Sequence, residues 1–471
     1  MKALVRIASL LLVVGSLSAC GGAEPKVFPE ANLVLVSIDT LRADHLSLYG
    51  YERPTSPYLE TLAKESIVFE NVIAQSTWTT PSHAAMFTSR YPTELGLRSW
   101  PDPGRIPDAF PTLPESLRNE GFATHAFTES AWMAGKFGFE RGFDRYDSTG
   151  GLMRRIFPRM EIALPSFVND RFFLFLHTYD VHWYEPIQEA LRPFERPYRG
   201  SLRPSNQLRR DVQNPRNRAW RESLTPTDLD YLVDLYDGSI REVDGYLERL
   251  VEVLKKAGVW ENTLLVITAD HGEEFLEHGL TGHGFSAYDE QIRVPLIVRL
   301  PKGAHGGRRV REQARSIDLY PTLLEWLGVS DPPVGLRGRS LAPVLDGKLD
   351  EIPAFVDRGH VPKVCIRTPE WKLIHDTKFN GFEAYELSSD PAESKNLARD
   401  EGAVPVELRT ALSSWLDGLE RPADPEPTPA LTEREKARMT ELGYTIEGEG
   451  DDAEKDGGNP KEQDESRKDR R

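Results

Sequence analysis

Apolar runs of strand length recur along most of the chain. Asn32–Ile38 (NLVLVSI) and Thr263–Thr268 are continuous runs of this kind, as are residues 172–176 and 294–299. A strand covered on both faces of a parallel sheet reads as a continuous apolar run, whereas a strand with one wet face alternates between apolar and polar residues. The pattern therefore predicts several central strands of one buried, mostly parallel sheet.

Between these runs, apolar residues recur at helical spacing. Residues 229–257 show it most clearly, with apolar side chains on one face and charged side chains on the other. Strands that alternate with helices predict an α/β architecture, here a large sheet sandwiched by helices over residues 31–335. In such a sheet the functional side chains gather at the carboxyl ends of the strands.

The pattern changes after Gly335. Short strand candidates at Lys363–Arg367 and at residues 372–375 precede a helix that we expect over residues 405–419. These elements predict a smaller C-terminal α+β subdomain over residues 336–421.

Two further parts follow this subdomain. Residues 422–447 combine a proline-rich linker with one more helix, expected over residues 431–442. Residues 448–471 are rich in Asp, Glu, Lys, Gly and Arg and contain too little apolar surface to fold. We therefore expect a disordered charged tail there.

The N-terminus resembles an export signal that ends in a lipidation site. A short basic region precedes an apolar run over residues 7–14, which is too short to span a membrane as a mature helix. The sequence LSACG then resembles the lipobox of bacterial lipoproteins, in which Cys20 becomes the acylated first residue. The resemblance implies a signal peptide over residues 1–20, a linker over residues 21–30, and an exported, membrane-anchored lipoprotein that is periplasmic or on the cell surface. The alternative is a signal peptide that ends in cysteine by chance.

Charge and composition narrow the class of partner. The formal net charge of -16 argues against nucleic acid as a partner, because an acidic surface repels phosphate backbones. With 471 residues, 39% of them hydrophobic, the chain can bury a large core. Once Cys20 is acylated, Cys365 is the only other cysteine, so the mature chain has no internal disulfide and we expect Cys365 to be a buried apolar residue.

Acids and a histidine follow two of the predicted strands directly. Asp39 follows the first strand, and Asp270 and His271 follow the run at 263–268. At the carboxyl ends of neighbouring strands such side chains can hold one divalent metal ion, and imidazole with carboxylate favours zinc or manganese over calcium. A helix-capping role for Asp39 would look the same in the sequence.

Further histidines lie near the same predicted edge. His177 and His182 follow the run at 172–176, and His283 lies in a glycine-rich loop after His271. A histidine pair beside the site can act as general acid and base or bind a substrate oxygen, but histidines bound to backbone carbonyls would give the same pattern. The sequence also leaves open a second metal ion built from Asp180, His182 and His283.

A polar cluster before an apolar stretch marks a helix N-terminus at residues 76–90 (STWTTPSHAAMFTSR). Pro81 fits the first turn, and the N-terminal N–H groups together with the helix dipole attract an anion. Thr79 or Thr80 would lie at that position, either as a cap or as a nucleophile.

Taken together, these segments resemble the sulfatase family of the alkaline phosphatase superfamily over residues 31 to about 420. SIDTLRADHLSLYGY resembles its first metal motif, TTPSHAAMFTSRYP its nucleophile helix, and TADHGEEFLEHGLTGHG its second metal motif. The resemblance implies an alkaline phosphatase-like fold and an ester hydrolase. It makes Asp39, Asp270 and His271 the metal ligands, with Thr79 at the nucleophile position.

The resemblance also assigns histidines to the substrate. His182 and His283 fall at substrate-contacting positions and would serve as catalytic acid or base. His83 stands where the usual sulfatase motif has an arginine, so it is expected to bind substrate together with His177. The spacing of His283 from His271 is similar to that of phosphoethanolamine transferases, which use a threonine nucleophile and one divalent ion.

Several departures from the usual sulfatase pattern favour phosphoryl chemistry. Thr79 replaces the cysteine or serine that is oxidised to formylglycine, and threonine cannot form that aldehyde. Thr40 replaces the second aspartate of the first motif, and the usual lysine-histidine segment is not recognisable near residues 127–132. Lys136 is too displaced to take that role.

The expected reaction is cleavage of a phosphate, phosphonate or sulfate ester. A metal ion would lower the pKa of the Thr79 hydroxyl so that its alkoxide attacks the ester, and His283 or His182 would protonate the leaving oxygen. Three alternatives remain: sulfate-ester hydrolysis without formylglycine, transfer of the group to an acceptor, and a non-catalytic anion-binding relative. The substrate class is a small molecule or a glycan or lipid ester, with specificity expected in loops at 154–165 and 192–221; the sequence leaves the oligomeric state undetermined.

Overall fold

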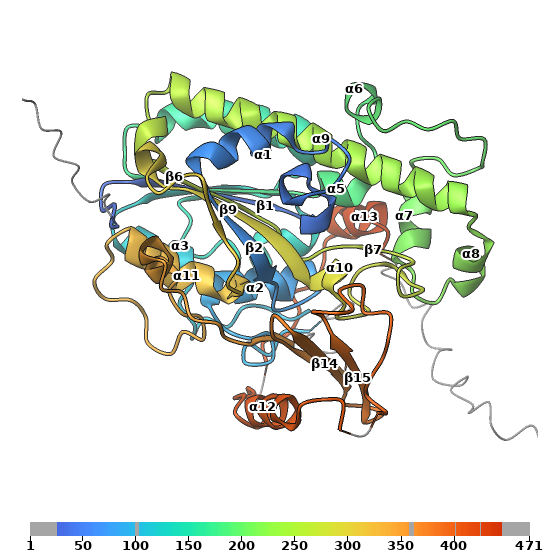
Figure 1. Cartoon of the computed structure of the whole chain (residues 1–471). Coiled ribbons are helices and arrows are strands. Elements are labelled where there is room, and N and C mark those ends of the chain that lie inside the picture. Colours follow the sequence, from blue (N-terminus) through green and yellow to red (C-terminus); the bar gives the residue numbers. More distant parts are fainter. Residues whose placement is uncertain (1–25, 99–102, 358–361, 401, 424, 445–471) are drawn as a thin grey trace, which may run out of the picture.

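The computed structural model describes residues 26–98, 103–357, 362–400, 402–423 and 425–444. The signal peptide, Cys20, half of the expected linker at 21–30 and the charged tail lie outside these residues. Within them, the predicted α/β domain and the smaller subdomain are both present (Figure 1).

A large sheet forms the centre of the main domain. Its strands follow the order β10-β2-β9-β6-β1-β5-β3-β4, and β11 also pairs with β2. All pairs are parallel except those of β9, which runs antiparallel to β2 and to β6. The strand bounds are β1 Asn32–Ile38, β2 Ile67–Ile73, β3 Ala123–Phe127, β4 Arg145–Asp147, β5 Phe172–Thr178, β6 Thr263–Thr268, β9 Arg293–Arg299, β10 Arg308–Val310 and β11 Ala314–Arg315.

The four predicted central strands are confirmed as β1, β5, β6 and β9, and every residue of β1, β5 and β6 is buried. The direction of β9 differs from the parallel expectation, because an apolar run reports burial on both faces and not strand direction.

Helices cover both faces of this sheet, as Figure 1 shows. On one face lie α1 (Pro57–Leu62), α4 (Leu152–Ala163), α5 (Asp180–Trp183) and α9 (Pro226–Lys256). On the other lie α2 (Thr79–Thr88), α3 (Leu113–Asn119) and α11 (Leu319–Trp326). The prediction of a loop at 154–165 is therefore wrong. Most of this stretch belongs to helix α4, which contains Pro158 and buries an apolar face.

Helix α9 follows from its sequence. Thr225 caps it in a reciprocal capping box with Asp228, Pro226 occupies the first turn, and Lys255 and Lys256 lie in the last turn. Its inward face buries leucines that each contribute about 1.5–3 kcal/mol through the hydrophobic effect.

Short elements complete the main domain around the expected specificity region. The stretch at 192–221 is partly helical, and its Arg209 is buried against Trp183. The elements are α6 Gln188–Leu191, α7 Asn206–Gln213, α8 Arg218–Ser223, β7 Glu274–Phe275, β8 Thr281–Gly282 and α10 Asp289–Ile292.

The C-terminal subdomain is a four-stranded antiparallel sheet with one helix against it. The strands are β12 (Ala354–Asp357), β13 (Lys363–Arg367), β14 (Trp371–Asp376) and β15 (Gly381–Glu386), followed by α12 (Val406–Asp417). Cys365 on β13 is buried and unpaired, as expected.

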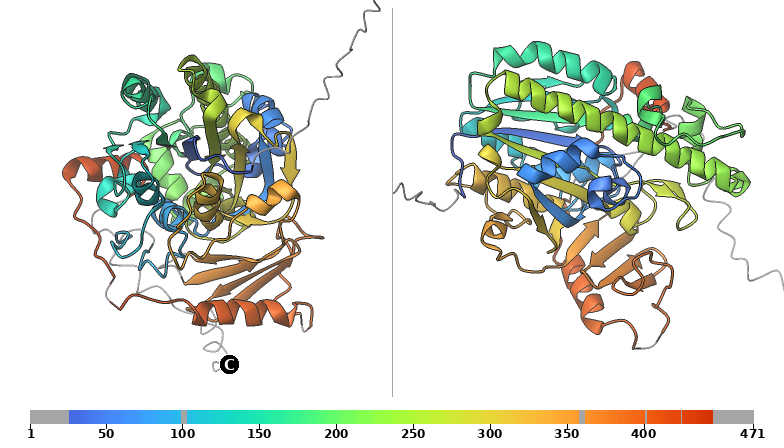
Figure 2. Two further views of the ribbon diagram at one scale, coloured as in Figure 1. Left: turned by 90° about the vertical axis from the view of Figure 1, so that its left-hand side faces the viewer. Right: turned by 45° about the horizontal axis from the view of Figure 1, so that its top comes forward.

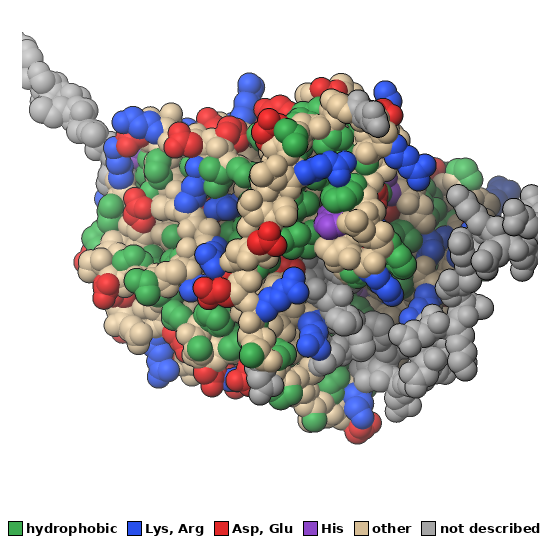
Figure 3. All heavy atoms as spheres, turned by 90° about the horizontal axis from the view of Figure 1, so that it is seen from below, with side chains coloured by type: hydrophobic (Ala, Val, Ile, Leu, Met, Phe, Trp, Pro, Cys, Tyr) green, Lys and Arg blue, Asp and Glu red, His purple; other side chains and the backbone are tan. Residues whose placement is uncertain are grey.

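Buried charges attach this subdomain to the main domain. Lys372 of β14 is completely buried, and its Nζ lies 2.6 Å from Asp289 of α10 and 2.7 Å from Glu393. Arg367 of β13 also pairs with Asp289, at 2.8 Å. On the face shown in Figure 3, by contrast, acidic and basic side chains are interspersed among apolar ones.

The chain then returns from the subdomain to the main domain. Figure 2 shows the connecting segment running from α12 to the last helix, α13 (Glu433–Glu441), which lies beside α7. In the part of the chain that the structure describes, no helix has the length and apolar character needed to cross a bilayer.

Candidate active site

Three neighbouring parallel strands bring the candidate residues together. Strand β1 pairs with β6 on one side and with β5 on the other. Asp39 follows β1 directly, and Asp270 and His271 follow the end of β6. The expected convergence at the carboxyl edge of the sheet is therefore confirmed.

Asp39, Asp270 and His271 form a cluster that fits one metal ion. One ligand atom from each lies within 4.8 Å of the others, and all three side chains are completely buried. Asp39 Oδ1, Asp270 Oδ2 and His271 Nε2 have no hydrogen-bond partner among the described residues. Because buried polar atoms are normally satisfied, three orphaned acceptors at one point indicate a cation.

The charges of the cluster support the same interpretation. Burial, together with the neighbouring charge of Asp270, raises the pKa of Asp39 well above its usual value. Burial also acts to raise the pKa of Asp270, but His271 and two further imidazoles outweigh it and lower that pKa to about 2. Two acids this close resist sharing negative charge unless a cation lies between them.

His271 is in the right tautomer to be a ligand. Its Nδ1 lies 3.0 Å from the carbonyl oxygen of Gly272, which can only accept a hydrogen bond. Nδ1 therefore carries the proton, and Nε2 presents its lone pair to the cluster.

Thr79 is the first residue of helix α2 and faces this cluster. Its Oγ1 donates a hydrogen bond to Asp39 Oδ2 at 3.2 Å, and the side chain is completely buried. The neighbouring Thr80 instead donates to the carbonyl oxygen of Trp132. The structure thus places Thr79, and not Thr80, beside the metal cluster.

His83 lies one helical turn after Thr79, and both of its ring nitrogens form hydrogen bonds. Its Nδ1 donates to the Thr79 carbonyl at 2.9 Å, and its Nε2 accepts from the Ser37 hydroxyl at 2.9 Å. Nδ1 also lies 3.4 Å from Asp270 Oδ2. These contacts fix α2 against the ends of the strands, and the substrate-binding role expected for His83 stays a prediction.

His177 borders the cluster from the end of β5. Its Nε2 lies 3.5 Å from Asp39 Oδ2, and within the described chain neither of its ring nitrogens has a hydrogen-bond partner. Burial lowers its pKa well below the usual value, which keeps the imidazole neutral. A neutral, unpartnered imidazole here can donate to or accept from a substrate oxygen.

His182 and His283 lie together on another side of the cluster. Their ring centroids are 5.2 Å apart, and His283 lies 4.4 Å from His271. His283 Nδ1 is held by Glu273 at 3.1 Å, and its Nε2 lies 3.1 Å from the Tyr444 hydroxyl. Burial lowers the pKa of His182 to about 3 and that of His283 well below its usual value.

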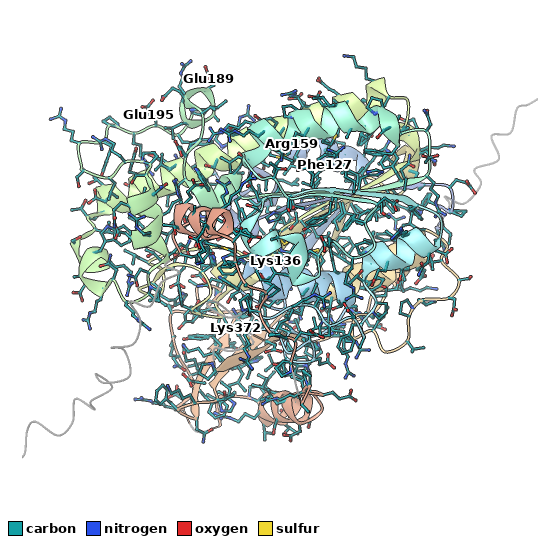
Figure 4. The ribbon with its side chains drawn as sticks, turned by 180° about the vertical axis from the view of Figure 1, so that it is seen from behind. Phe127, Lys136, Arg159, Glu189, Glu195 and Lys372 are labelled. Carbon is teal, nitrogen blue, oxygen red and sulfur yellow. The ribbon has the colours of Figure 1, made fainter. Side chains whose placement is uncertain are left out.

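Other residues of the same segments lie elsewhere. Asp180 accepts hydrogen bonds from the Thr178 hydroxyl and from the Met153 N–H, and among the described residues only the Asp39 cluster gathers three metal-binding groups. The second metal site considered from the sequence is therefore not assembled. Lys136, labelled in Figure 4, does not reach the site either, since its Nζ binds Glu435 of α13.

Sequence reasoning missed the residues that close this site. Tyr444 comes from the far end of the chain, while Trp78 and Trp132 flank it with ring centroids at 6.0 and 5.5 Å. The available signal was the apolar spacing of Met439 and Leu442 at the end of the terminal helix, which indicates docking on the main domain.

Comparison with known proteins agrees with this geometry. The family model described as "Sulfatase" matches residues 31–329, and the model of the C-terminal part of N-sulphoglucosamine sulphohydrolase matches residues 277–420. A Delta 4,5-hexuronate-2-O-sulfatase of Bacteroides thetaiotaomicron is 24% identical over 444 residues, which cover 82% of this chain and 88% of the relative. A multifunctional alkaline phosphatase superfamily protein of Trinickia caryophylli is 33% identical over 188 residues, covering 35% of this chain and 36% of the relative.

Solved structures share the fold. A 2-O GAG sulfatase superposes with a TM-score of 0.68 at 21% identity, covering 84% of this chain and 95% of that one. The phosphonate monoester hydrolase of Agrobacterium radiobacter superposes with a TM-score of 0.65 at 19% identity, covering 83% and 95%. At these identities the likeness establishes the alkaline phosphatase-like fold.

Fold and site together define a hydrolase of the alkaline phosphatase superfamily that acts on ester bonds. Within that superfamily, the chain belongs to the sulfatase family. Its Asp39, Asp270 and His271 form a group that can hold a metal ion, as the superfamily uses.

Proposed function

We propose that this protein cleaves phosphate or phosphonate esters with Thr79 as nucleophile. The observation that carries the proposal is the position of Thr79 Oγ1, 3.2 Å from a carboxylate of the only metal-competent cluster among the described residues. A hydroxyl at the first residue of a helix and beside such a cluster has the placement that attack on an oxyanion ester requires.

The reaction has two balanced halves. Thr79 Oγ1 attacks phosphorus, a new O–P bond forms, the bond to the leaving alcohol oxygen breaks, and the Thr79 proton passes toward Asp39 Oδ2. A proton delivered through His283 or His182 neutralises the leaving oxygen. Water then attacks the phosphorus of the phosphothreonine and gives one proton to His283 or His182, while the bond between Thr79 Oγ1 and phosphorus breaks. Phosphate or phosphonate leaves, and the proton held at Asp39 returns to the Thr79 hydroxyl.

The N-terminus of α2 supports the negative charge on the transferred group. Within the described chain no side chain caps this helix end. Pro81 has no N–H and the Ser82 N–H binds the Trp78 carbonyl, so the N–H groups of Thr79 and Thr80 are the ones that can reach the ester oxygens. The divalent ion held by Asp39, Asp270 and His271, zinc or manganese, would supply Lewis-acid stabilisation of the same charge.

Sulfate-ester hydrolysis is the second candidate. Its support is the sulfatase relatives, among them a Delta 4,5-hexuronate-2-O-sulfatase and an N-acetylglucosamine-6-O-sulfatase of Bacteroides thetaiotaomicron. Against it stands Thr79, which cannot become formylglycine. Parallel assays of aryl phosphate, phosphonate monoester and aryl sulfate substrates separate the two.

We further propose that the protein is exported and anchored through acylated Cys20. The basis is the LSACG sequence after a short apolar run. Replacing Cys20→Ala should release the protein from the membrane fraction, and retention there would contradict the anchor.

The nucleophile is tested by two neighbouring substitutions. Thr79→Ala should lower kcat by at least about a thousandfold, because the attacking atom is removed. Thr80→Ala is the matched control, since that hydroxyl binds the Trp132 carbonyl, and it should retain most of the activity. Equal activities of the two folded variants would eliminate the nucleophilic role of Thr79.

A further inference from the structure

The two histidines that are candidates for proton transfer have different surroundings. Both ring nitrogens of the buried His182 lack a hydrogen-bond partner among the described residues. The ring of His283, in contrast, is held at both ends: Nδ1 lies 3.1 Å from Glu273 Oε1, and Nε2 lies 3.1 Å from the Tyr444 hydroxyl. The structure therefore fixes the orientation of His283, whereas no described hydrogen bond fixes that of His182.

The contact between Glu273 and His283 follows from the hairpin that carries them. Strands β7 and β8 pair antiparallel, with Glu274 opposite Gly282. Glu273 directly precedes β7 and His283 directly follows β8, so the same register places these two residues opposite each other. Side chains opposite each other on an antiparallel pair have Cβ atoms about 4.5–5.5 Å apart, which brings a carboxylate within reach of an imidazole.

The neighbouring acid, Glu274, binds elsewhere. Its Oε2 accepts hydrogen bonds from the Ser286 hydroxyl at 3.0 Å and from Gln291 Nε2 at 2.9 Å. Successive side chains of a strand point to opposite faces, so one of these two buried acids meets His283 and the other holds the loop after it. Glu274 is thus a matched control for Glu273.

Glu273 is completely buried and held in place. Arg42 Nη1 donates to its backbone carbonyl at 3.0 Å, and Gln213 Nε2 lies 3.5 Å from both carboxylate oxygens. An ionised carboxylate accepts hydrogen bonds and donates none, so the proton between Glu273 and His283 is on Nδ1. In the neutral ring Nε2 then carries the lone pair and accepts from the Tyr444 hydroxyl.

We propose that Glu273 is a positioning residue: it fixes His283 in the tautomer whose Nε2 exchanges a proton with the reacting oxygen. This inference rests on the proposed ester hydrolysis at Thr79 and assigns the proton transfers to His283 instead of His182. A proton passes from Nε2 to the leaving oxygen in the first half and returns to Nε2 from the attacking water in the second, while Nδ1 keeps its proton. Glu273 stabilises the positive ring whenever both nitrogens are protonated.

The first test measures whether Glu273 acts through His283. The amide of Glu273→Gln can donate to Nδ1 and favour the other tautomer, so kcat/KM for esters of basic alcohols should fall on the order of a hundredfold. Glu274→Gln should lose far less. The double variant Glu273→Gln/His283→Ala should be no slower than His283→Ala alone, because the effects of residues that act as a unit do not add.

The second test determines the tautomer directly and needs no acid variant. Nitrogen-15 NMR is recorded on the zinc-loaded unaltered protein at mildly alkaline pH, and the ring signals of His283 are assigned by their loss in His283→Gln. We expect a protonated Nδ1 and an Nε2 without a proton. Glu273→Gln should shift the ring toward the other tautomer, and Glu274→Gln should not.

Several outcomes would overturn the inference. These are an unchanged kcat/KM in Glu273→Gln, an equal loss in Glu274→Gln, additive losses in the double variant, and a proton on Nε2 instead of Nδ1 in the unaltered protein. The NMR measurement decides the matter even where Glu273→Gln does not fold. Failure of the proposed function shows separately, as full activity of Thr79→Ala, and the coupling between Glu273 and His283 can be measured in that case too.

Discussion

The hydroxyl of Thr79 lies 3.2 Å from Oδ2 of Asp39, although one residue begins helix α2 and the other follows strand β1. The parallel pairing of β1 with β6 then adds Asp270 and His271 to the same point. The hydroxyl that we propose as nucleophile and three side chains that can hold a metal ion therefore meet where a helix N-terminus and two strand ends converge.

His283 should matter through proton transfer to the leaving group. His283→Ala is expected to lower kcat by about a hundredfold to a thousandfold for esters of basic alcohols, and much less for nitrophenyl esters, whose leaving groups need no proton. His278→Ala is the control from the same loop, since His278 lies 3.0 Å from Glu290. Steady-state rates over a series of leaving groups measure this, and an equal loss for all of them would exclude the assignment.

Lys372 should be essential for stability because it is a buried charge between two acids. Lys372→Met leaves Glu393 without its ion pair, so the free energy of unfolding should fall by about 3–5 kcal/mol. Lys363→Met on the adjacent strand is the control, since its pair with Glu383 is longer, at 3.6 Å, and part-exposed, and should contribute less than about 1 kcal/mol. Urea unfolding measures both, and similar losses would contradict the assignment.

Asp244 should make the protein less stable as the pH rises. The carboxylate is buried in α9 beside the first turn of α1, and burial raises its pKa to about 6. Because the folded-state pKa lies above the unfolded one, the contribution of Asp244 to the free energy of unfolding is greatest below about pH 4. This contribution declines by about 3 kcal/mol as the pH rises past about 6. Unfolding free energies of the unaltered protein and of Asp244→Asn should diverge over this range, and a constant difference would refute the effect.

Gly443 should be required for docking of the terminal segment. Its φ is +100°, and a Cβ there would lie 2.7 Å from the Arg209 carbonyl oxygen. Gly443→Ala should therefore lower the free energy of unfolding by about 1–3 kcal/mol more than a glycine substitution that meets no neighbouring atom. Gly258→Ala is the control, because Gly258 also has positive φ but has open space around its Cβ position. Urea unfolding compares them, and equal losses of stability in the two variants would argue against this close packing.

Local sequence pattern was sufficient to predict the fold class and the grouping of the side chains that can hold a metal ion. Apolar runs located β1, β5, β6 and β9, and acids placed directly after such runs located Asp39 and Asp270, because strand ends meet at one edge of a sheet. The direction of β9 was not predictable, since pairing direction depends on partners that lie far along the chain. Helix α4 was missed because Pro158 interrupts its sequence signal.

The closure of the site could not be read from local pattern. Tyr444 reaches His283 only after the chain has passed through the C-terminal subdomain and returned, and no periodicity encodes that path. Similarly, only the structure shows that Thr80 turns to the Trp132 carbonyl while Thr79 turns to Asp39. Such choices depend on packing between distant segments.

The most direct test of the account is the metal content of the purified protein, measured by mass spectrometry after dialysis against zinc or manganese. The unaltered protein should hold about one ion per chain, and Asp270→Asn should hold less than about a tenth of that, because the substitution removes an anionic ligand from the cluster. Asp180→Asn should keep the full amount, since Asp180 binds Thr178 and Met153 instead. A full complement of metal in Asp270→Asn would contradict the central claim that these side chains share one cation.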